Sequence, residues 1–285
     1  PMSPSDSGLS LGGIFSQRIK LNKKFFSKYG LSPLLGPSFT ESEITTIIKK
    51  FKMRFSIPSK LEKDIASEIE KKKIVGVFNG RAEFGQRSLG SRSILADPRN
   101  KMSKNILNQK IKRRDWFMPF APAVIDNKFK KYFKTKIPSM YMQKAEDLNK
   151  KFRKLIPSAV HVNNTCRAQF VDRKVFPFFW RILKEFYKKT SIPIVLNTSF
   201  NRHGISTICT PRQAVEHLLE GNIDILYLHR YKIEFQKNRR YKAEKNKFLS
   251  DQDELFIECK KWLKNNKFKM SSKSIKKFNN YLKKL

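Results

Sequence analysis

The chain has 285 residues, 39% of them hydrophobic, which is enough for the core of one large domain or two small ones. Its formal net charge is +37, and no stretch approaches the ~20 consecutive apolar residues of a membrane-spanning helix. This composition excludes a disordered chain and a protein anchored by transmembrane helices. The sequence opens without the basic and then apolar order of a signal peptide, so we expect a cytoplasmic protein. Without a CxxC pair, the cysteines are expected to be reduced packing residues: Cys166, Cys209 and Cys259.

The first part of the chain predicts helices joined by polar turns. Two sequences have the form of a capping box, in which a hydroxyl side chain precedes a glutamate by three residues: Thr40 with Glu43, and Ser59 with Glu62. In the second helix an apolar residue recurs every four positions over 61–69, which predicts one buried stripe.

A predicted strand then leads directly into an unusual arginine-rich stretch. IVGVF (74–78) is typical of a buried strand, and GRAEFGQRSLGSRSILADPR (80–99) follows it. Arginine makes up only 17 of the 61 basic residues, so about one is expected in a stretch of this length. The four arginines here have planar forks of donors that bind phosphate or carboxylate oxygens, so we expect an anion-binding loop: Arg81, Arg87, Arg92 and Arg99. We expect Glu83 and Asp97 to hold neighbouring arginines rather than act as acid or base.

Strands and helices alternate along the rest of the chain. A helix with a buried aromatic stripe is predicted over 176–189, and Thr210 with Gln213 caps another that ends near Gly221. Such alternation favours an α/β fold over 61–235, followed by a lysine-rich tail over 236–285. The further strands are predicted at 123–125, 159–162, 168–171, 192–196 and 223–228.

The large positive charge raises the question of nucleic-acid binding. Residues 236–285 hold 16 basic and 5 acidic residues, a net of +11, so about two-thirds of the excess charge lies elsewhere. A charge spread this widely is a general compositional bias, so we do not expect nucleic acid as a partner.

Four motifs occur in a fixed order: GRAEFGQRSLGSRSILADPR (80–99), IKRRDWFMPFAPAV (111–124), HVNNTCRAQ (161–169) and LNTSFNRHGISTICTP (196–211). Together they resemble the C-terminal half of the O-carbamoyltransferases related to NodU, CmcH and TobZ. In that family an actin-like ATPase domain precedes a YrdC-like domain. The resemblance implies a remnant of the actin-like domain at 1–60 and a YrdC-like twisted sheet with flanking helices at 61–235.

The resemblance also implies a reaction. The YrdC-like half takes carbamoyl phosphate and ATP, with Mg²⁺, to carbamoyl adenylate, and the actin-like half passes the carbamoyl group to an acceptor hydroxyl. The acceptor, a sugar or a natural product, is not identified by the sequence. An actin-like half supplied as a separate chain would be the partner. Two alternatives stay open: a non-catalytic nucleotide- or RNA-binding protein, and an inactive fragment.

Site residues are carried over by motif position. The resemblance implies a catalytic clamp of Arg87, Lys112 and Arg167, although Arg87 or Arg167 could instead be a surface ion-pair partner. His161 could contact substrate or simply orient a loop through one hydrogen bond. Because Ser199 and Asn201 are two apart at a strand end, their side chains can point to the same side. The residues expected to bind substrate or nucleotide are Arg81, Arg92, His161, Asn197, Ser199 and Asn201.

Some positions depart from the family pattern. Met118 stands where the family usually has arginine, Asn163 replaces an aspartate, and Ile205 replaces a glutamate. Asp6 matches a metal-ligand aspartate of the actin-like domain, but its histidine partners would belong to the N-terminal half. A single carboxylate rarely holds a metal in water, so iron or another divalent metal is expected only if that half is supplied.

Overall fold

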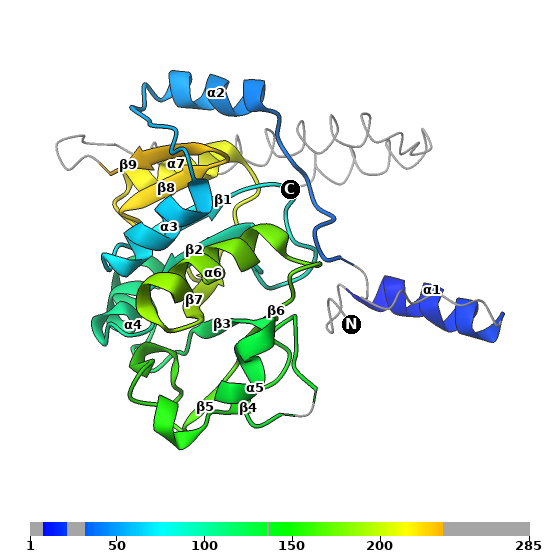
Figure 1. Cartoon of the computed structure of the whole chain (residues 1–285). Helices are drawn as coiled ribbons and strands as arrows, with labels where there is room; N and C mark the ends of the chain where they lie inside the picture. Colours follow the sequence, from blue (N-terminus) through cyan, green and yellow to red (C-terminus); the bar gives the residue numbers. More distant parts are fainter. Residues whose placement is uncertain (1–7, 22–31, 136, 236–285) are drawn as a thin grey trace. The chain divides into compact units, whose positions relative to one another are not determined.

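The computed structural model describes residues 8–21, 32–135 and 137–235 (Figure 1). Asp6, Cys259 and the predicted tail at 236–285 lie outside the described residues. The helices are α1 (Leu9–Lys20), α2 (Glu41–Lys50), α3 (Leu61–Glu70), α4 (Met102–Ile106), α5 (Phe129–Tyr132), α6 (Pro177–Thr190) and α7 (Pro211–Leu219). The strands are β1 (Val75–Phe78), β2 (Arg92–Ala96), β3 (Ala121–Ile125), β4 (Glu146–Asp147), β5 (Thr165–Cys166), β6 (Gln169–Val171), β7 (Ile194–Ser199), β8 (Ile225–Leu228) and β9 (Tyr231–Glu234).

Seven of these strands form one mixed sheet in the order β6-β3-β7-β2-β1-β8-β9. The β1–β8 and β3–β6 pairs are parallel, and the other neighbours are antiparallel. β4 and β5 form a separate two-stranded sheet. The α/β class expected from the alternating sequence pattern is therefore confirmed.

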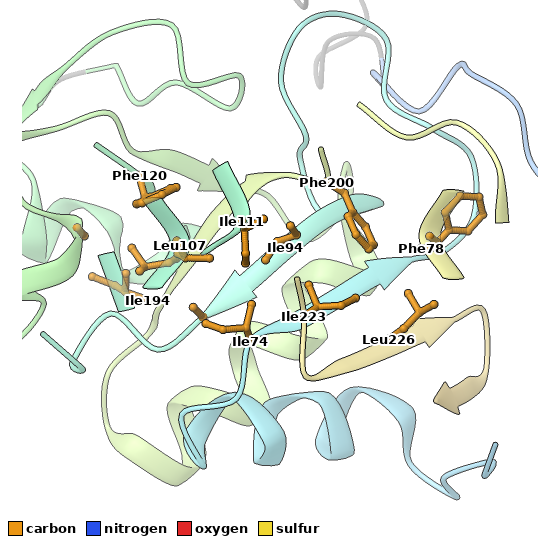
Figure 2. Packing of buried hydrophobic residues seen from close by; sticks show 14 of the residues in the cluster. Ile74, Phe78, Ile94, Leu107, Ile111, Phe120, Ile194, Phe200, Ile223 and Leu226 are labelled. Carbon is orange, nitrogen blue, oxygen red and sulfur yellow. The ribbon is translucent and has the colours of Figure 1, made fainter. Parts of the chain in front are cut away.

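Helices cover both faces of the sheet. Ile65 and Ile69 of α3 pack with Phe186 of α6 against one face, which buries the stripe predicted over 61–69. On the other face, residues of α2, of α7 and of the turn after α4 join one buried cluster with the sheet. Figure 2 shows side chains of this cluster, among them Ile94 and Leu226. Because successive side chains of a strand point to opposite faces, a sheet covered on both sides reads as a continuous apolar run.

The helix caps and one predicted strand differ in how well they follow the sequence pattern. Capping boxes are present at Thr40 and Thr210, as predicted. The box expected at Ser59 is wrong: Lys60 is the N-cap residue of α3 and no side chain caps it. The strand expected at 159–162 is also wrong, because Pro157 opens a single 3₁₀ turn and Val162 is 76% exposed. No helix in the described ranges is both long enough and apolar enough to cross a membrane.

Candidate functional site

A small cationic cavity of about 60 Å³ lies beside the end of β7. Arg87, Arg114 and Arg167 all line it, although they come from three separate segments of the chain. Among the described residues that form its wall, none carries a carboxylate. Three guanidinium groups without a neutralising acid repel one another, so this arrangement favours a bound anion.

The pKa of the Arg167 guanidinium reflects this setting. Burial lowers the pKa to about 10, and the positive charges of Arg87 and Arg114 act in the same direction. The Arg167 Nε is buried and has no hydrogen-bond partner in the described structure. Among the described residues Arg167 has no ion-pair partner, and it lies in the wall of the small cavity, where its charge can act on an anion.

Arg114 was not selected from the sequence, although it lies inside the second motif. Its Nε donates to Asn108 Oδ1 at 2.9 Å, and its guanidinium lies 4.8 Å from the centre of the Phe120 ring. The adjacent Arg113, in contrast, is exposed and has a left-handed backbone with φ of 49°. Nothing in the sequence distinguishes the two arginines, because only the turn geometry decides which one points into the cavity.

Lys112 is a buried lysine that contacts the end of β7. It closes a π-helical turn, Leu107–Lys112, and is only 3% exposed. Its Nζ lies within hydrogen-bond distance of four oxygens, which are Ser199 Oγ at 3.1 Å, Asn201 Oδ1 at 2.5 Å and the backbone oxygens of both residues, and its three N–H groups are shared among them. Burial, with a smaller contribution from Arg114, lowers the pKa of Lys112 to about 7. Four oxygens therefore surround this ammonium, and none of them is charged.

Ser199 and Asn201 do point toward each other. Ser199 Oγ donates to Asn201 Oδ1 at 2.6 Å, and the Asn201 amide also reaches the backbone oxygen of Ile205. Ser199 lines the small cavity, whereas Asn201 lines a larger neighbouring cavity. Lys112 thus binds one residue from each cavity wall.

The larger cavity has a volume of about 470 Å³. It shares Gln86, Arg87 and Ser88 with the small cavity. The two cavities therefore adjoin along the loop between β1 and β2, which we call the arginine loop. Glu83 and Cys209 also contribute to its wall. The volume lies in the range typical of small-molecule sites.

The arginine loop between β1 and β2 is held by a carboxylate. Glu83 Oε1 accepts hydrogen bonds from the backbone N–H groups of Leu89, Ser91 and Arg92, at 2.7, 2.6 and 3.2 Å. As expected, Glu83 holds a neighbouring arginine, Arg92, and it does so through the backbone N–H. Burial lowers the pKa of the Arg92 guanidinium, and the charge of Glu83 opposes this effect. Glu83 lines the larger cavity and not the small one that Arg87, Arg114 and Arg167 share.

Arg92 lies at the start of β2 and is almost fully buried, with 1% exposure. Its Nη1 and Nη2 donate to the backbone oxygens of Pro37, Asn79, Gly80 and Ser91. Only one nitrogen, Nε, is left without a partner in the described structure. Arg92 also lines the larger cavity, but most of its donors join loop segments to one another.

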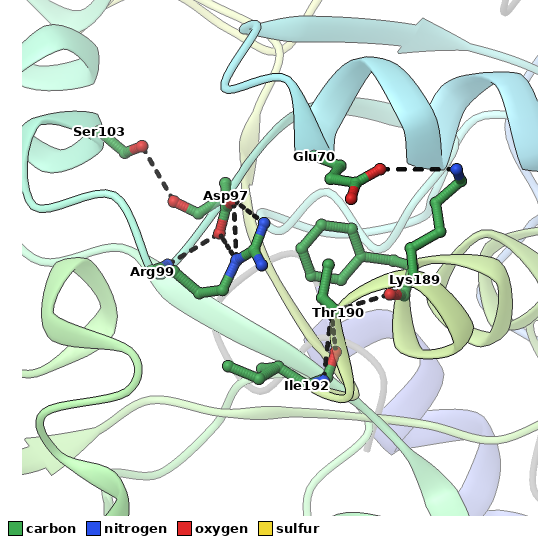
Figure 3. Close-up of polar contacts among 8 residues, drawn as sticks. Glu70, Asp97, Arg99, Ser103, Lys189, Thr190 and Ile192 are labelled. Carbon is green, nitrogen blue, oxygen red and sulfur yellow. Dashed lines mark hydrogen bonds and ion pairs between the residues drawn. The ribbon is translucent and has the colours of Figure 1, made fainter.

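The two other arginines of the stretch are bound to the protein itself. Arg81 donates to the backbone oxygens of Leu35 and Gly36 and lines neither of the two cavities above. Arg99 forms an ion pair with the buried Asp97, as expected for Asp97 (Figure 3). Of the four arginines in 80–99, Arg87 is the one that lines both cavities.

His161 contacts its own loop. Its Nδ1 lies 3.0 Å from Thr165 Oγ1, which in turn donates to Asn163 Oδ1. Burial lowers the His161 pKa, and the charges of Arg167 and Lys104 lower it further, so the ring is neutral at pH 7. Its Nε2 is buried without a partner in the part of the chain that the structure describes. His161 thus orients the loop and keeps one nitrogen uncommitted near Arg167.

Asn197, the remaining predicted binding residue, is buried in β7. Its Nδ2 donates to Ser88 O at 3.0 Å and to Gln169 Oε1 at 2.8 Å. Asn197 lines the small cavity with Arg87, Arg167 and Ser199. Across the described ranges no three His, Cys, Asp or Glu side chains gather in a way that could hold a metal ion.

Comparisons with known proteins give a family match and several similar proteins. Residues 66–234 match the family described as carbamoyltransferase C-terminus. The chain is 36% identical over 232 residues to uncharacterized protein MJ1058 of Methanocaldococcus jannaschii, covering 79% of this chain and 38% of that protein. It is 31% identical over 204 residues to nodulation protein U of Bradyrhizobium diazoefficiens, covering 72% of this chain and 34% of that protein. A crystal structure of T. kodakarensis HypF covers 64% of this chain and 22% of that one, with a TM-score of 0.43 and 18% identity.

The chain therefore spans well under half the length of these curated relatives. The family match nevertheless extends over more than half of the 285 residues, and it includes the whole seven-stranded sheet and the residues around the small cavity. By this match, the chain belongs to the carbamoyltransferase C-terminus family.

Proposed function

We propose that this chain forms carbamoyl adenylate from carbamoyl phosphate and ATP, from which the carbamoyl group passes to a hydroxyl acceptor. The proposal rests chiefly on Arg87, Arg114 and Arg167 around one cavity whose described wall holds no carboxylate. Family membership supports carbamoyl transfer in general. Both substrates carry several negative charges, so their approach to each other needs cations held in fixed positions.

The reaction has two steps. Water first cleaves carbamoyl phosphate, which gives inorganic phosphate, carbamate and a proton. A carbamate oxygen then attacks the α-phosphorus of ATP, the bond from that phosphorus to the bridging oxygen breaks, and pyrophosphate leaves. The cavity wall must hold the attacking oxygen about 3–3.5 Å from phosphorus and in line with the leaving group.

In this proposal the small cavity holds the carbamoyl unit, and the triphosphate extends past Arg87 into the larger cavity. Arg167 and Arg114 balance the charge of the carboxylate-like oxygens. Lys112 keeps Ser199 and Asn201 in place between the two cavities and adds a positive charge when protonated. Arg81, Arg92 and His161 support the loops around the site.

Magnesium enters this site with the nucleotide rather than through a protein cage. Glu83, the carboxylate among the described residues of the larger cavity wall, already accepts three backbone hydrogen bonds. A lone, occupied carboxylate does not fit a protein-held metal centre, whereas Mg²⁺ is commonly bound through substrate phosphates. No step is assigned to an iron or other metal of the actin-like domain.

The test uses the full 285-residue chain with ATP and carbamoyl phosphate. We expect release of pyrophosphate that requires carbamoyl phosphate and Mg²⁺, and a large loss of this activity in Arg167→Ala. The matched control is Arg113→Ala, which removes an exposed arginine outside both cavity walls. Absence of pyrophosphate from the wild-type chain under all conditions would overturn the proposal.

The acceptor step belongs to a second part of the proposal. The curated relatives are more than twice as long as the matched region, so we assign hydroxyl transfer to an actin-like half supplied in addition to this chain. We expect transfer to a panel of sugars only when such a half is added. Efficient carbamoylation of a sugar by the 285-residue chain alone would contradict this division of labour.

A further inference from the structure

The buried side-chain amides of Gln169 and Asn197 contact the arginine loop and have a fixed orientation. Gln169 Nε2 donates to the backbone oxygen of Leu89 at 3.1 Å, so the Gln169 amide oxygen must face the other way. That oxygen accepts from Asn197 Nδ2 at 2.8 Å, and the same Nδ2 donates to the backbone oxygen of Ser88 at 3.0 Å. Because a backbone oxygen only accepts, these contacts fix which end of each amide is nitrogen.

This orientation leaves an acceptor without a donor. Asn197 Oδ1 is buried and has no hydrogen-bond partner in the described structure, and Asn197 is 1% exposed. Ser88 Oγ is also buried without a partner, and Ser88 is 3% exposed. Both residues line the small cavity. Buried polar groups without partners are rare and costly, so each calls for an explanation.

We infer that Asn197 Oδ1 accepts a hydrogen bond from the amino group of the carbamoyl unit and so selects carbamoyl over acetyl and carboxylate groups. This inference rests on the proposed function and adds a specificity role to it. An amino group supplies two donors, one for Asn197 Oδ1 and one for Ser88 Oγ. Gln169 acts as a positioning residue, because it stops the Asn197 amide from turning its nitrogen into the cavity.

The rest of the cavity wall accounts for the other atoms of the same unit. The guanidinium groups of Arg87, Arg114 and Arg167 can donate hydrogen bonds to the oxygens of the carbamoyl unit. The amide oxygen of Asn197 would repel those oxygens, so it suits the amino group instead. A volume of about 60 Å³ admits a planar group of a few heavy atoms and little more. The cavity wall therefore contains both donors and an acceptor, as recognition of a carbamoyl group requires.

Acetyl phosphate provides the direct test, because it differs from carbamoyl phosphate by a methyl group in place of the amino group. We expect the wild-type chain to bind acetyl phosphate about 10- to 100-fold more weakly in calorimetry, since the methyl group leaves the buried acceptor unpaired. Equal affinity for the two acyl phosphates in the wild-type chain would overturn the inference without any variant.

Two variants examine the residues themselves. Asn197→Leu removes the acceptor, so we expect the affinity ratio between the two acyl phosphates to fall to within about threefold. In Gln169→Met the Asn197 amide loses one of its two orienting contacts and keeps the one to Ser88 O, so the ratio should fall by less than in Asn197→Leu. Asn222→Leu is the matched control, because Asn222 is 6% exposed and lies outside the described walls of both cavities. A ratio unchanged in Asn197→Leu, or reduced equally in Asn222→Leu, would contradict the assignment.

The outcomes separate this inference from the proposed function. Pyrophosphate release with both carbamoyl and acetyl phosphate at similar rates would remove the specificity role and leave adenylate formation standing. If the wild-type chain binds neither acyl phosphate and releases no pyrophosphate, both proposals fail.

Discussion

The Lys112 ammonium lies 2.5 Å from the amide oxygen of Asn201, a residue 89 positions further along the chain. This contact joins the π-helical turn Leu107–Lys112 to the loop that follows β7. Burying a lysine without a carboxylate partner opposes its charged form, which explains the lowered pKa of about 7. A group with this pKa changes its charge when an anion binds nearby.

Binding of ATP should therefore take up a proton at pH 8. At this pH most Lys112 side chains are neutral, and a bound anion raises the pKa so that the lysine becomes charged. At pH 5 Lys112 is already protonated, so the proton uptake due to Lys112 should vanish there. Calorimetry in buffers of different ionisation enthalpy measures the uptake. We expect Lys112→Met to lose it, and an unchanged uptake in that variant would contradict the role given to Lys112.

Neighbouring arginines in the second motif should differ sharply in their effect. Arg114→Ala should weaken carbamoyl phosphate binding by about 1.5 to 3 kcal/mol, the range for charge-assisted hydrogen bonds, because Arg114 lines the small cavity. Arg113→Ala should change it by less than about 0.5 kcal/mol, since an exposed charge is screened by solvent. Calorimetry at fixed salt compares the two, with thermal melting as the check on folding. Equal losses would mean that overall charge, rather than the cavity, governs binding.

A third prediction concerns the carboxylate that holds the arginine loop. Glu83→Leu removes the acceptor of three backbone N–H groups, so it should destabilise the fold and weaken ATP binding at least tenfold. Glu83→Gln keeps a side-chain oxygen in the same place and should retain most of both properties. Urea unfolding and calorimetry measure the two effects. If Gln and Leu behave alike, the negative charge matters more than the hydrogen bonds.

Much of the fold could be predicted from sequence because apolar periodicity and capping residues act locally. The stripe over 61–69 and the capping boxes at Thr40 and Thr210 need only neighbouring residues to be recognised. The strand β2 (Arg92–Ala96) was missed, because an arginine at the start of a central strand opposes the usual pattern of burial. Its guanidinium is satisfied by backbone oxygens that only the folded loop brings together.

The site could be predicted from the sequence only in part, because some of its contacts form only in the folded chain. Motif positions named Arg87, Lys112 and Arg167, and the structure places two of them in one cavity wall while Lys112 contacts Ser199 in that wall. Arg114 and Gln169 were not selected, because their roles depend on a turn geometry and on an amide partner 28 residues away.

The last prediction tests whether the arginine loop tolerates a side chain at Gly90, where the backbone lies close to Phe179. Gly90 has a φ of +121°, and a Cβ added there would lie 2.5 Å from Cγ of Phe179, which is buried at the start of α6. Gly90→Ala should lower the free energy of unfolding by more than about 2 kcal/mol, because both the backbone and the ring must shift.

Gly204 supplies the matched control, since its φ is also positive, at +79°, but an added Cβ would meet no atom within 4 Å. Gly204→Ala should therefore cost only the conformational strain, about 1 kcal/mol. The difference between the two variants in urea unfolding measures the clash with Phe179 together with the greater backbone strain at φ +121°. Calorimetry with ATP shows whether a displaced loop moves Arg87. We expect the Gly90 variant to lose affinity as well as stability, because Glu83 binds the backbone of both residues next to Gly90 in the loop that carries Arg87. Similar losses of stability in both variants would show that the close approach of Gly90 to Phe179 does not constrain the loop.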